Sequence, residues 1–580
     1  MRKRVDASSE ISLLYLPGKD KVSGGSRWGE YAVEDLEIER LAWALSIQNE
    51  YQEAIKCVLL ELCQDTDTLL YRQEILEDFL NRPALADRLE GLLSKLAKLG
   101  DYASSRYERT PLRETLARLS ELNLYVDCIR TLKTTLEDPQ MVTNSRGMET
   151  LRRWAEQTVA DEEFQSLEKE LPGLLAKLNG IPSISIGVNL DGQLRPVEAT
   201  LLAIHEKPFK GGGSFLDKVT GRRSGKKPNQ GIGPLHEVSH QYMDAPGGRL
   251  IPLPTRADPL LVPLFRDLYE MLRWLVAPIN DVLQQFAQVD ISYLISLETE
   301  IAFYIGAAKF VTQMKSLGMP MCRPQILAAG TRSGQLERMY NLFLAMHKAE
   351  ETPATVLTDK IVLNNVNFGP EGRIFVLTGP NLGGKTVYTQ AVGVIQVLFQ
   401  AGLSVPAISA SISPVDSIYT HFARLERSDS GMGRLGDEAQ RLNVIFQSIS
   451  EKSLVLLNES LASTSPGESL YLARDIVRAL RLYGARAIFA THLHELADSV
   501  DTINAEVQGD SRVISLVAGI GEPNRDARGE EDIVPRTYHI QPGPPLGLSY
   551  ARGIASRYGI SFEQLSSKWK EKMESKIPEA

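Results

Sequence analysis

The sequence predicts two fold classes in one chain: a mainly α-helical core and lever region with a small β clamp insertion, followed by an α/β domain of the P-loop type. A short apolar run at residues 374–377 opens into a glycine-rich loop and then a helical pattern, which indicates the α/β domain. Apolar residues at three- and four-residue steps over about 34–175 and 259–317 indicate the helices. Alternation of apolar and polar residues between 182 and 204 indicates the β insertion.

The glycine-rich loop fits the pattern G-x-x-x-x-G-K-T. Backbone N–H groups converge on phosphate oxygens only where side chains are absent, which explains the glycines. Lys385 would reach the β- and γ-phosphates, and the Thr386 hydroxyl would hold Mg²⁺. A functionless glycine-rich turn would not explain why strand, loop and helix follow in this order. We therefore expect ATP and Mg²⁺ at Gly379, Pro380, Asn381, Leu382, Gly383, Gly384, Lys385 and Thr386.

Length and composition are those of a multidomain globular protein. The 580 residues suffice for about four domains of roughly 150 residues each, and 43% are hydrophobic and 24% charged. The basic start lacks an apolar segment behind it, and no run of about 18 apolar residues follows, so we expect neither a secretory signal nor a membrane span. Four cysteines without metal or redox spacing indicate free thiols and a cytoplasmic protein.

The chain divides into four predicted segments. Residues 1–30 are polar and rich in glycine and serine, which indicates a tail or a short cap. Residues 31–350 form the helical core, whose long helices would act as a lever; a compact bundle is the alternative. Residues 351–560 form the α/β domain, and 561–580 a C-terminal helical tail.

The β insertion, at about 182–230, combines a hairpin with a basic loop. Asp191 and Gly192 would form a two-residue turn between its strands. The net charge of −9 restricts any nucleic-acid surface to a local patch, and this loop would neutralise phosphates without reading bases. A solvated surface loop is the alternative. The basic residues are Lys207, Lys210, Lys218, Arg222, Arg223, Lys226 and Lys227.

A second metal-site pattern occurs at His236-Glu237-Val-Ser-His240. Two histidines four residues apart on a helix bind Zn²⁺ in one class of protease, with the glutamate as base. The segment follows a glycine- and proline-containing stretch and has no convincing third ligand nearby. A chance match is therefore the favoured interpretation.

Two further strands end in polar residues. The run 453–457 leads into Asn458 and Glu459, and the run 487–490 leads into Thr491 and His492. An aspartate usually ends the first of these strands in P-loop enzymes and fixes Mg²⁺. Asn458 occupies that position and brings no charge. We expect Glu459 to act as the base and His492 to contact the γ-phosphate.

Several segments resemble the ATPase domain of the MutS family, and the pair Pro380-Asn381 is its most specific mark. The similar segments are 378–386, 405–407, 458–465, 490–495, 538–539 and 547–551, with weaker similarity at 71–80 and 321–324. The resemblance implies an ABC-type ATPase that acts on double-stranded or branched DNA as a homodimer. It also implies that Asn364 contacts adenine and that the β insertion is the DNA clamp.

Three departures from the family pattern stand out. We expect no N-terminal mismatch-reading domain, because no segment matches its Phe-x-Glu motif, and no nuclease-like domain at the C-terminus. The segment that acts on the partner subunit's nucleotide differs from the family sequence, and either Ser430 or Arg434 could serve.

The function predicted from the sequence is an ATPase that opens and closes a DNA clamp in repair or recombination. The principal alternative is a nucleotide-gated DNA-binding protein that barely hydrolyses ATP, because Asn458 replaces the aspartate. A transporter ATPase and a zinc protease are weaker alternatives. The sequence does not identify the DNA structure or any protein partner.

Overall fold

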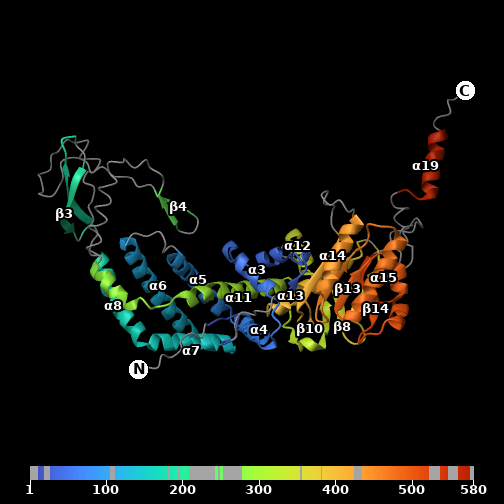
Figure 1. The fold of residues 1–580 in the computed structure, drawn as a ribbon, viewed down its shortest axis with the longest axis horizontal. Helices are drawn as coiled ribbons and strands as arrows, with labels where there is room; N and C mark the ends of the chain where they lie inside the picture. Colours follow the sequence, from blue (N-terminus) through green and yellow to red (C-terminus); the bar gives the residue numbers. More distant parts are fainter. Residues whose placement is uncertain are drawn as a thin grey trace. The chain divides into compact units, whose positions relative to one another are not determined.

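The computed structural model divides into two compact units, which we describe separately (Figure 1). Unit 1 comprises Met1–Leu93, Thr135–Arg152 and Ser296–Ala580, and unit 2 comprises Ser94–Thr134 and Arg153–Ile295. The sequence-based domain boundaries stay predictions. The structure describes residues 11–18, 27–104, 111–179, 183–193, 196–205, 207, 242–245, 249–252, 277–352, 356–380, 382–423, 434–520, 536–545 and 559–574.

Unit 1 contains a seven-stranded sheet in the order β1-β11-β12-β13-β9-β14-β15. All neighbouring strands are parallel except β14 and β15. Every position of β9, β11, β12 and β13 is buried, as expected for parallel strands covered on both faces. The strands are β1 (Arg27–Trp28), β9 (Ile374–Thr378), β11 (Ser417–Phe422), β12 (Leu454–Asn458), β13 (Arg486–Ala490), β14 (Val513–Ile520) and β15 (Arg536–Pro542).

Helices cover both faces of this sheet. Val455 of β12 shares a buried cluster with Ile445 of α14 and Val477 of α15. On the opposite face, a Cβ at Gly393 of α13 would lie 2.8 Å from Leu456 Cδ1, so the helix packs closely there. The helices of this region are α13 (Lys385–Gln400), α14 (Arg434–Ser448), α15 (Pro466–Tyr483), α16 (His494–Asp498) and α17 (Val500–Glu506).

A second, four-stranded sheet in unit 1 was not predicted. Its order is β6-β10-β7-β8, and its strands are β6 (Gln325–Ile326), β7 (Gly334–Met339), β8 (Asn364–Phe368) and β10 (Ser409–Ile412). These strands are short and partly exposed, and the alternation in β8 and β10 covers too few residues to mark a strand in sequence.

Within the described residues, helices occupy most of the stretches in which the sequence predicts them. Among them, α5, α6, α7 and α11 contribute residues to both units. They are α1 (Ala32–Asp35), α2 (Ile38–Ala44), α3 (Gln52–Leu60), α4 (Thr66–Asn81), α5 (Pro83–Ser104), α6 (Pro111–Glu137), α7 (Arg146–Ala160), α8 (Glu162–Asn179), α11 (Ser292–Ser316) and α12 (Leu342–Glu351). The C-terminal segment forms α19 (Phe562–Glu574), which confirms its helical prediction.

The described residues near the N-terminus form a cap, and not a free tail. Glu300 of α11 accepts hydrogen bonds from the Ser12 hydroxyl and from the Leu13 main chain. The Tyr304 hydroxyl donates to the Leu13 carbonyl, and Leu13 is fully buried. Polar composition hid this role, because two of the three anchoring bonds involve the main chain of Leu13.

Unit 2 contains the predicted hairpin, of β2 (Ser183–Leu190) and β3 (Pro196–His205). The predicted two-residue turn at Asp191-Gly192 is wrong. Leu190 pairs with Pro196, and register shifts near the strand end lengthen the connection to residues 191–195. A second hairpin, β4 (Tyr242–Ala245) and β5 (Arg249–Pro252), was not predicted.

Several sequence predictions concern residues outside those described. They are Asn381, Ser430, the residues of the zinc-protease pattern and the basic loop beyond Lys207. All four cysteines are described and are free thiols, as predicted. Of the helices that the structure describes, none is long and apolar enough to cross a membrane.

Candidate functional site

The carboxyl ends of β9, β12 and β13 bring the predicted site residues to one edge of the sheet. These strands are direct neighbours, with β13 pairing to both of the others. The glycine-rich loop leaves β9 and ends at Gly384, which is the N-cap of α13. Main-chain N–H groups at a helix start attract anions, so this edge is suited to phosphate.

Steric limits explain two of the loop glycines. Gly379 has a φ of 142°, and a Cβ there would lie 2.7 Å from the Ala518 Cβ on β14. A Cβ at Gly383 would lie 2.8 Å from the carbonyl oxygen of Pro380. Both distances are too short for any other side chain, so the tight loop itself requires glycine.

Lys385 folds back over its own loop. Its Nζ donates to the carbonyl oxygens of Gly379 at 3.0 Å and Pro380 at 3.2 Å, and it lies 3.5 Å from His492 Nε2. Burial lowers the pKa of Lys385 to about 8, although the Glu459 carboxylate acts in the opposite direction. The ammonium group is thus held inside the loop by neutral oxygens that a phosphate could replace.

Thr386 and Asn458 come together as a candidate metal-binding pair. The Thr386 hydroxyl donates to Asn458 Oδ1 at 3.2 Å, and Asn458 is buried at the end of β12. Magnesium takes oxygen ligands and keeps several waters, so a hydroxyl and an amide oxygen fit it when phosphates supply the negative charge. The pair itself brings no charge.

Glu459 and His492 form the polar pair beyond the strand ends. His492 Nε2 lies 2.8 Å from Glu459 Oε1, and both side chains are partly exposed. Glu459 has a left-handed φ of 54°, and its N–H donates to the Ala490 carbonyl at 2.8 Å. A non-glycine residue in this conformation is strained, and the main-chain bond to β13 helps to hold it.

Asn364 makes contacts that the sequence did not predict. Its Nδ2 donates to the Tyr538 carbonyl at 3.1 Å, and its Oδ1 accepts from the Ile540 N–H at 2.8 Å. Its amide therefore joins β8 to β15. A Cβ at Gly384 would lie only 3.6 Å from Tyr538 Cδ1, so this half-exposed ring lies beside the loop. Tyr538 entered the sequence-based prediction only within the family-like segment 538–539, although an aromatic residue there was a usable signal.

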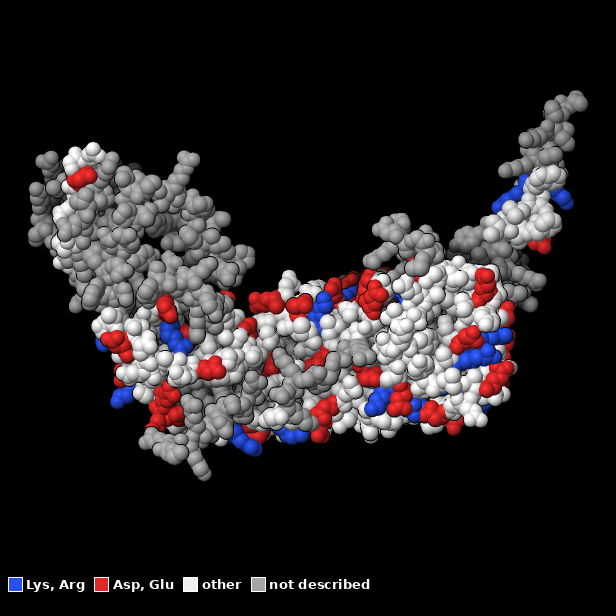
Figure 2. All heavy atoms as spheres, viewed as in Figure 1, with Lys and Arg blue, Asp and Glu red and all other residues white. Residues whose placement is uncertain are grey.

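Of the predicted DNA-contact residues, only Lys207 lies among the residues that the structure describes. Lys207, the one basic-loop residue that the structure describes, is exposed after β3, and its carbonyl accepts from the Ser183 hydroxyl. On the face of the described residues shown in Figure 2, acidic and basic side chains are interspersed, without a broad basic patch. Arg434 begins α14.

Together, the parallel sheet, the glycine loop and the polar strand ends define an α/β domain with a glycine-rich loop at the start of a helix. Family models agree and are more specific: residues 64–317 match the MutS2 N-terminal domain, and residues 375–518 match MutS domain V. The chain belongs to the MutS family.

Curated relatives carry the same family name. DNA mismatch repair protein MutS of Chlorobium phaeobacteroides is 30% identical over 234 residues, which are 39% of this chain and 25% of that protein. Endonuclease MutS2 of Lactiplantibacillus plantarum is 30% identical over 206 residues, 35% of this chain and 24% of that protein. DNA mismatch repair protein MutS 2 of Halobacterium salinarum is 35% identical over 143 residues, 24% of this chain and 17% of that protein. The chain spans about a quarter or less of the length of these relatives.

Proposed function

We propose that this protein binds ATP with Mg²⁺ at the loop of residues 379–386 and hydrolyses it to control its grip on DNA. One observation carries the proposal: three separate segments meet at one edge of the sheet. Lys385 and Thr386 begin α13, Glu459 follows β12, and His492 follows β13. The match to MutS domain V supports it.

Each of these groups has a role in the proposed reaction. Phosphate oxygens replace the two carbonyl partners of Lys385, whose ammonium then neutralises them. Bound Mg²⁺ supplies further charge neutralisation, and Thr386 and Asn458 would hold it. Glu459 accepts a proton from the attacking water, and His492, bonded to Glu459, orients that carboxylate and contacts the γ-phosphate. The half-exposed ring of Tyr538 provides a surface on which adenine stacks.

The DNA part of the proposal comes from the family. Names of the relatives refer to mismatch repair and to an endonuclease, which indicates DNA repair or recombination as the setting. The basic loop after β3 would contact DNA phosphates, and two subunits would close over ATP. Ser430 and Arg434 are the candidates for the contact in trans.

A second candidate function follows from Asn458. Without a carboxylate at the end of β12, Mg²⁺ binds less tightly, and ATP would act as a structural ligand that gates DNA binding with little turnover. Steady-state kinetics separates this possibility from the ATPase.

The experiment is ATP hydrolysis by the purified protein, alone and with duplex, mismatched or branched DNA. We expect turnover that DNA stimulates and that Lys385→Ala abolishes, with Lys98→Ala, an exposed lysine of α5, as the matched control. ATP binding without turnover on any DNA would contradict hydrolysis and support the gating function. Loss of activity in both variants would show that the substitutions act by disturbing the folded protein and not by removing a contact with ATP.

A further inference from the structure

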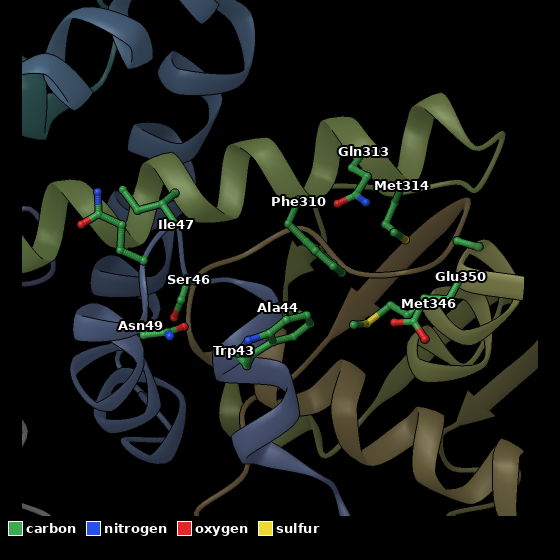
Figure 3. Close-up of a pocket in the computed structure, with 12 residues that line it drawn as sticks. Trp43, Ala44, Ser46, Ile47, Asn49, Phe310, Gln313, Met314, Met346 and Glu350 are labelled. Carbon is green, nitrogen blue, oxygen red and sulfur yellow. The ribbon is translucent and has the colours of Figure 1, made fainter. Parts of the chain in front are cut away.

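A cavity lies in unit 1, at the place where helices α2, α11 and α12 meet (Figure 3). It has a volume of about 460 Å³, within the usual range of about 300–1,000 Å³ for small-molecule pockets. Phe310 and Met314 of α11 and Met346 of α12 are buried and form an apolar floor. The Trp43 ring is 55% exposed and converges with Phe310 and Met346 in Figure 3.

Polar groups converge on the same cavity. The side chains of Gln48, Asn49 and Gln313 line it, and Glu350 of α12 is its one charged residue. Within the described part of the chain, the structure shows no side-chain hydrogen bond or ion pair for these four residues. An apolar floor with a few uncommitted polar groups is the usual composition of a ligand site.

The charge of the lining selects among ligand classes. A nucleotide would bring its phosphates to Glu350 with no lining lysine or arginine to receive them. A flat aromatic cation would instead place its ring on Trp43 and its positive charge near the indole face and the Glu350 carboxylate. The three amides would accept or donate hydrogen bonds at the rim.

The walls of the cavity are hydrogen-bonded to the helix that follows the phosphate-binding loop. Gln390 of α13 donates through Nε2 to the carbonyl of Asp35, the last residue of α1, at 3.1 Å, and to Oε1 of Glu37, the N-cap of α2, at 3.0 Å. Asn341, the N-cap of α12, donates through Nδ2 to the Val387 carbonyl and to Gln390 Oε1, both at 3.0 Å. Gln390 thus links α2 and α12 to α13.

We propose that the cavity lined by Trp43, Met346 and Glu350 binds a small flat aromatic cation, and that its occupancy is coupled to α13 through Gln390. The binding site stands independently, whereas the coupling rests on the proposed ATP binding. A ligand that shifts α2 relative to α12 must change the bonds of Gln390, on the helix whose first residues are Lys385 and Thr386.

The first experiment tests the site without ATP. The full chain, labelled at its methionine methyl groups, is titrated with tryptamine, tryptophol and indole-3-acetate, which share a ring and differ in charge. We expect shifts at Met314 and Met346, with affinity in the order cation, neutral, anion. Trp43→Ala should weaken all three about tenfold, and Glu350→Gln should remove the preference for the cation, which is about three- to tenfold.

Glu371→Gln, which removes an exposed carboxylate outside the cavity, is the matched control and should change nothing. Absence of shifts at the two methionines would overturn the site. Equal affinity for tryptamine and indole-3-acetate would overturn the ligand class.

The second experiment tests the coupling. Saturating tryptamine should change the Kd of ATP about fivefold or more, and ATP should change the Kd of tryptamine by the same factor. Gln390→Ala should keep both ligands bound but bring that factor close to one. Unchanged values in the native protein would overturn the coupling. If ATP did not bind, both the coupling and the proposed function would be wrong. The first experiment would still show whether the cavity binds the aromatic cation.

Discussion

The strands of the seven-stranded sheet and the hairpin of unit 2 show two ways of presenting functional residues. Every position of β13 is buried, whereas β2 is half-buried along most of its length and exposed at its last two residues. Strands β12 and β13 each pair with buried parallel strands on both sides, and this pairing fixes where the strand ends. Asn458 and Glu459 are therefore held in place by main-chain hydrogen bonds. A two-stranded hairpin holds its ends less firmly. The sheet edge therefore suits the proposed reaction, and the hairpin suits the proposed surface contact.

The largest expected effect concerns Glu459, at the sheet edge. If it is the base, Glu459→Gln should lower ATP turnover by about 10²- to 10⁴-fold, because the amide cannot accept the proton. Binding of ATP should change little, since the two side chains have nearly the same shape. Rapid-mixing turnover and equilibrium binding measure the two quantities. Turnover within threefold of the native value would remove Glu459 from the mechanism.

The next effect compares the two kinds of strand directly. Phe489 is fully buried in β13, and Leu202 in β3 is 67% exposed. Phe489→Ala should lower the free energy of unfolding by about 3–5 kcal/mol through cavity formation, and Leu202→Ala by less than about 0.5 kcal/mol. Urea denaturation followed by circular dichroism provides both values. Similar losses would mean that the hairpin is packed as tightly as the sheet.

A smaller effect follows from the lowered pKa of Lys385, which burial brings to about 8. Below this pH the side chain is charged and ready for phosphate; above it, ATP binding must first add a proton. The affinity for ATP should therefore fall about tenfold between pH 7.5 and pH 9. Calorimetry in two buffers of different ionisation enthalpy should show proton uptake above pH 8. Adenosine, which has no phosphates, is the control and should bind independently of pH.

The smallest expected effect concerns Asn458, the uncharged residue that ends β12. Asn458→Asp adds a carboxylate beside Thr386 and should lower the Mg²⁺ concentration needed for half-maximal turnover about three- to tenfold. Leu457→Ile, a change of similar size within β12, controls for packing. An unchanged Mg²⁺ requirement would show that Asn458 lies outside the reach of the metal.

Much of the α/β domain was predictable because its signals are local. Three signals follow one another in the chain. They are an apolar run, a loop with glycines where a Cβ would clash, and a helix that begins with Lys385 and Thr386. The strand ends at Asn458 and His492 were predictable for the same reason. The four-stranded sheet was not, since short half-exposed strands are defined by their partners.

The order of residues along the chain was enough to predict which side chains end the strands, where the glycine-rich loop lies and which segments resemble the MutS family. Which of these groups meet could be seen only in the folded chain, because hydrogen bonds between distant residues leave no periodic pattern in the sequence. Asn364 joins β15, Gln390 links α2 with α12, and residues 12 and 13 bind Glu300. In each case the partner lies more than 40 residues away in the chain, where local propensity carries no information.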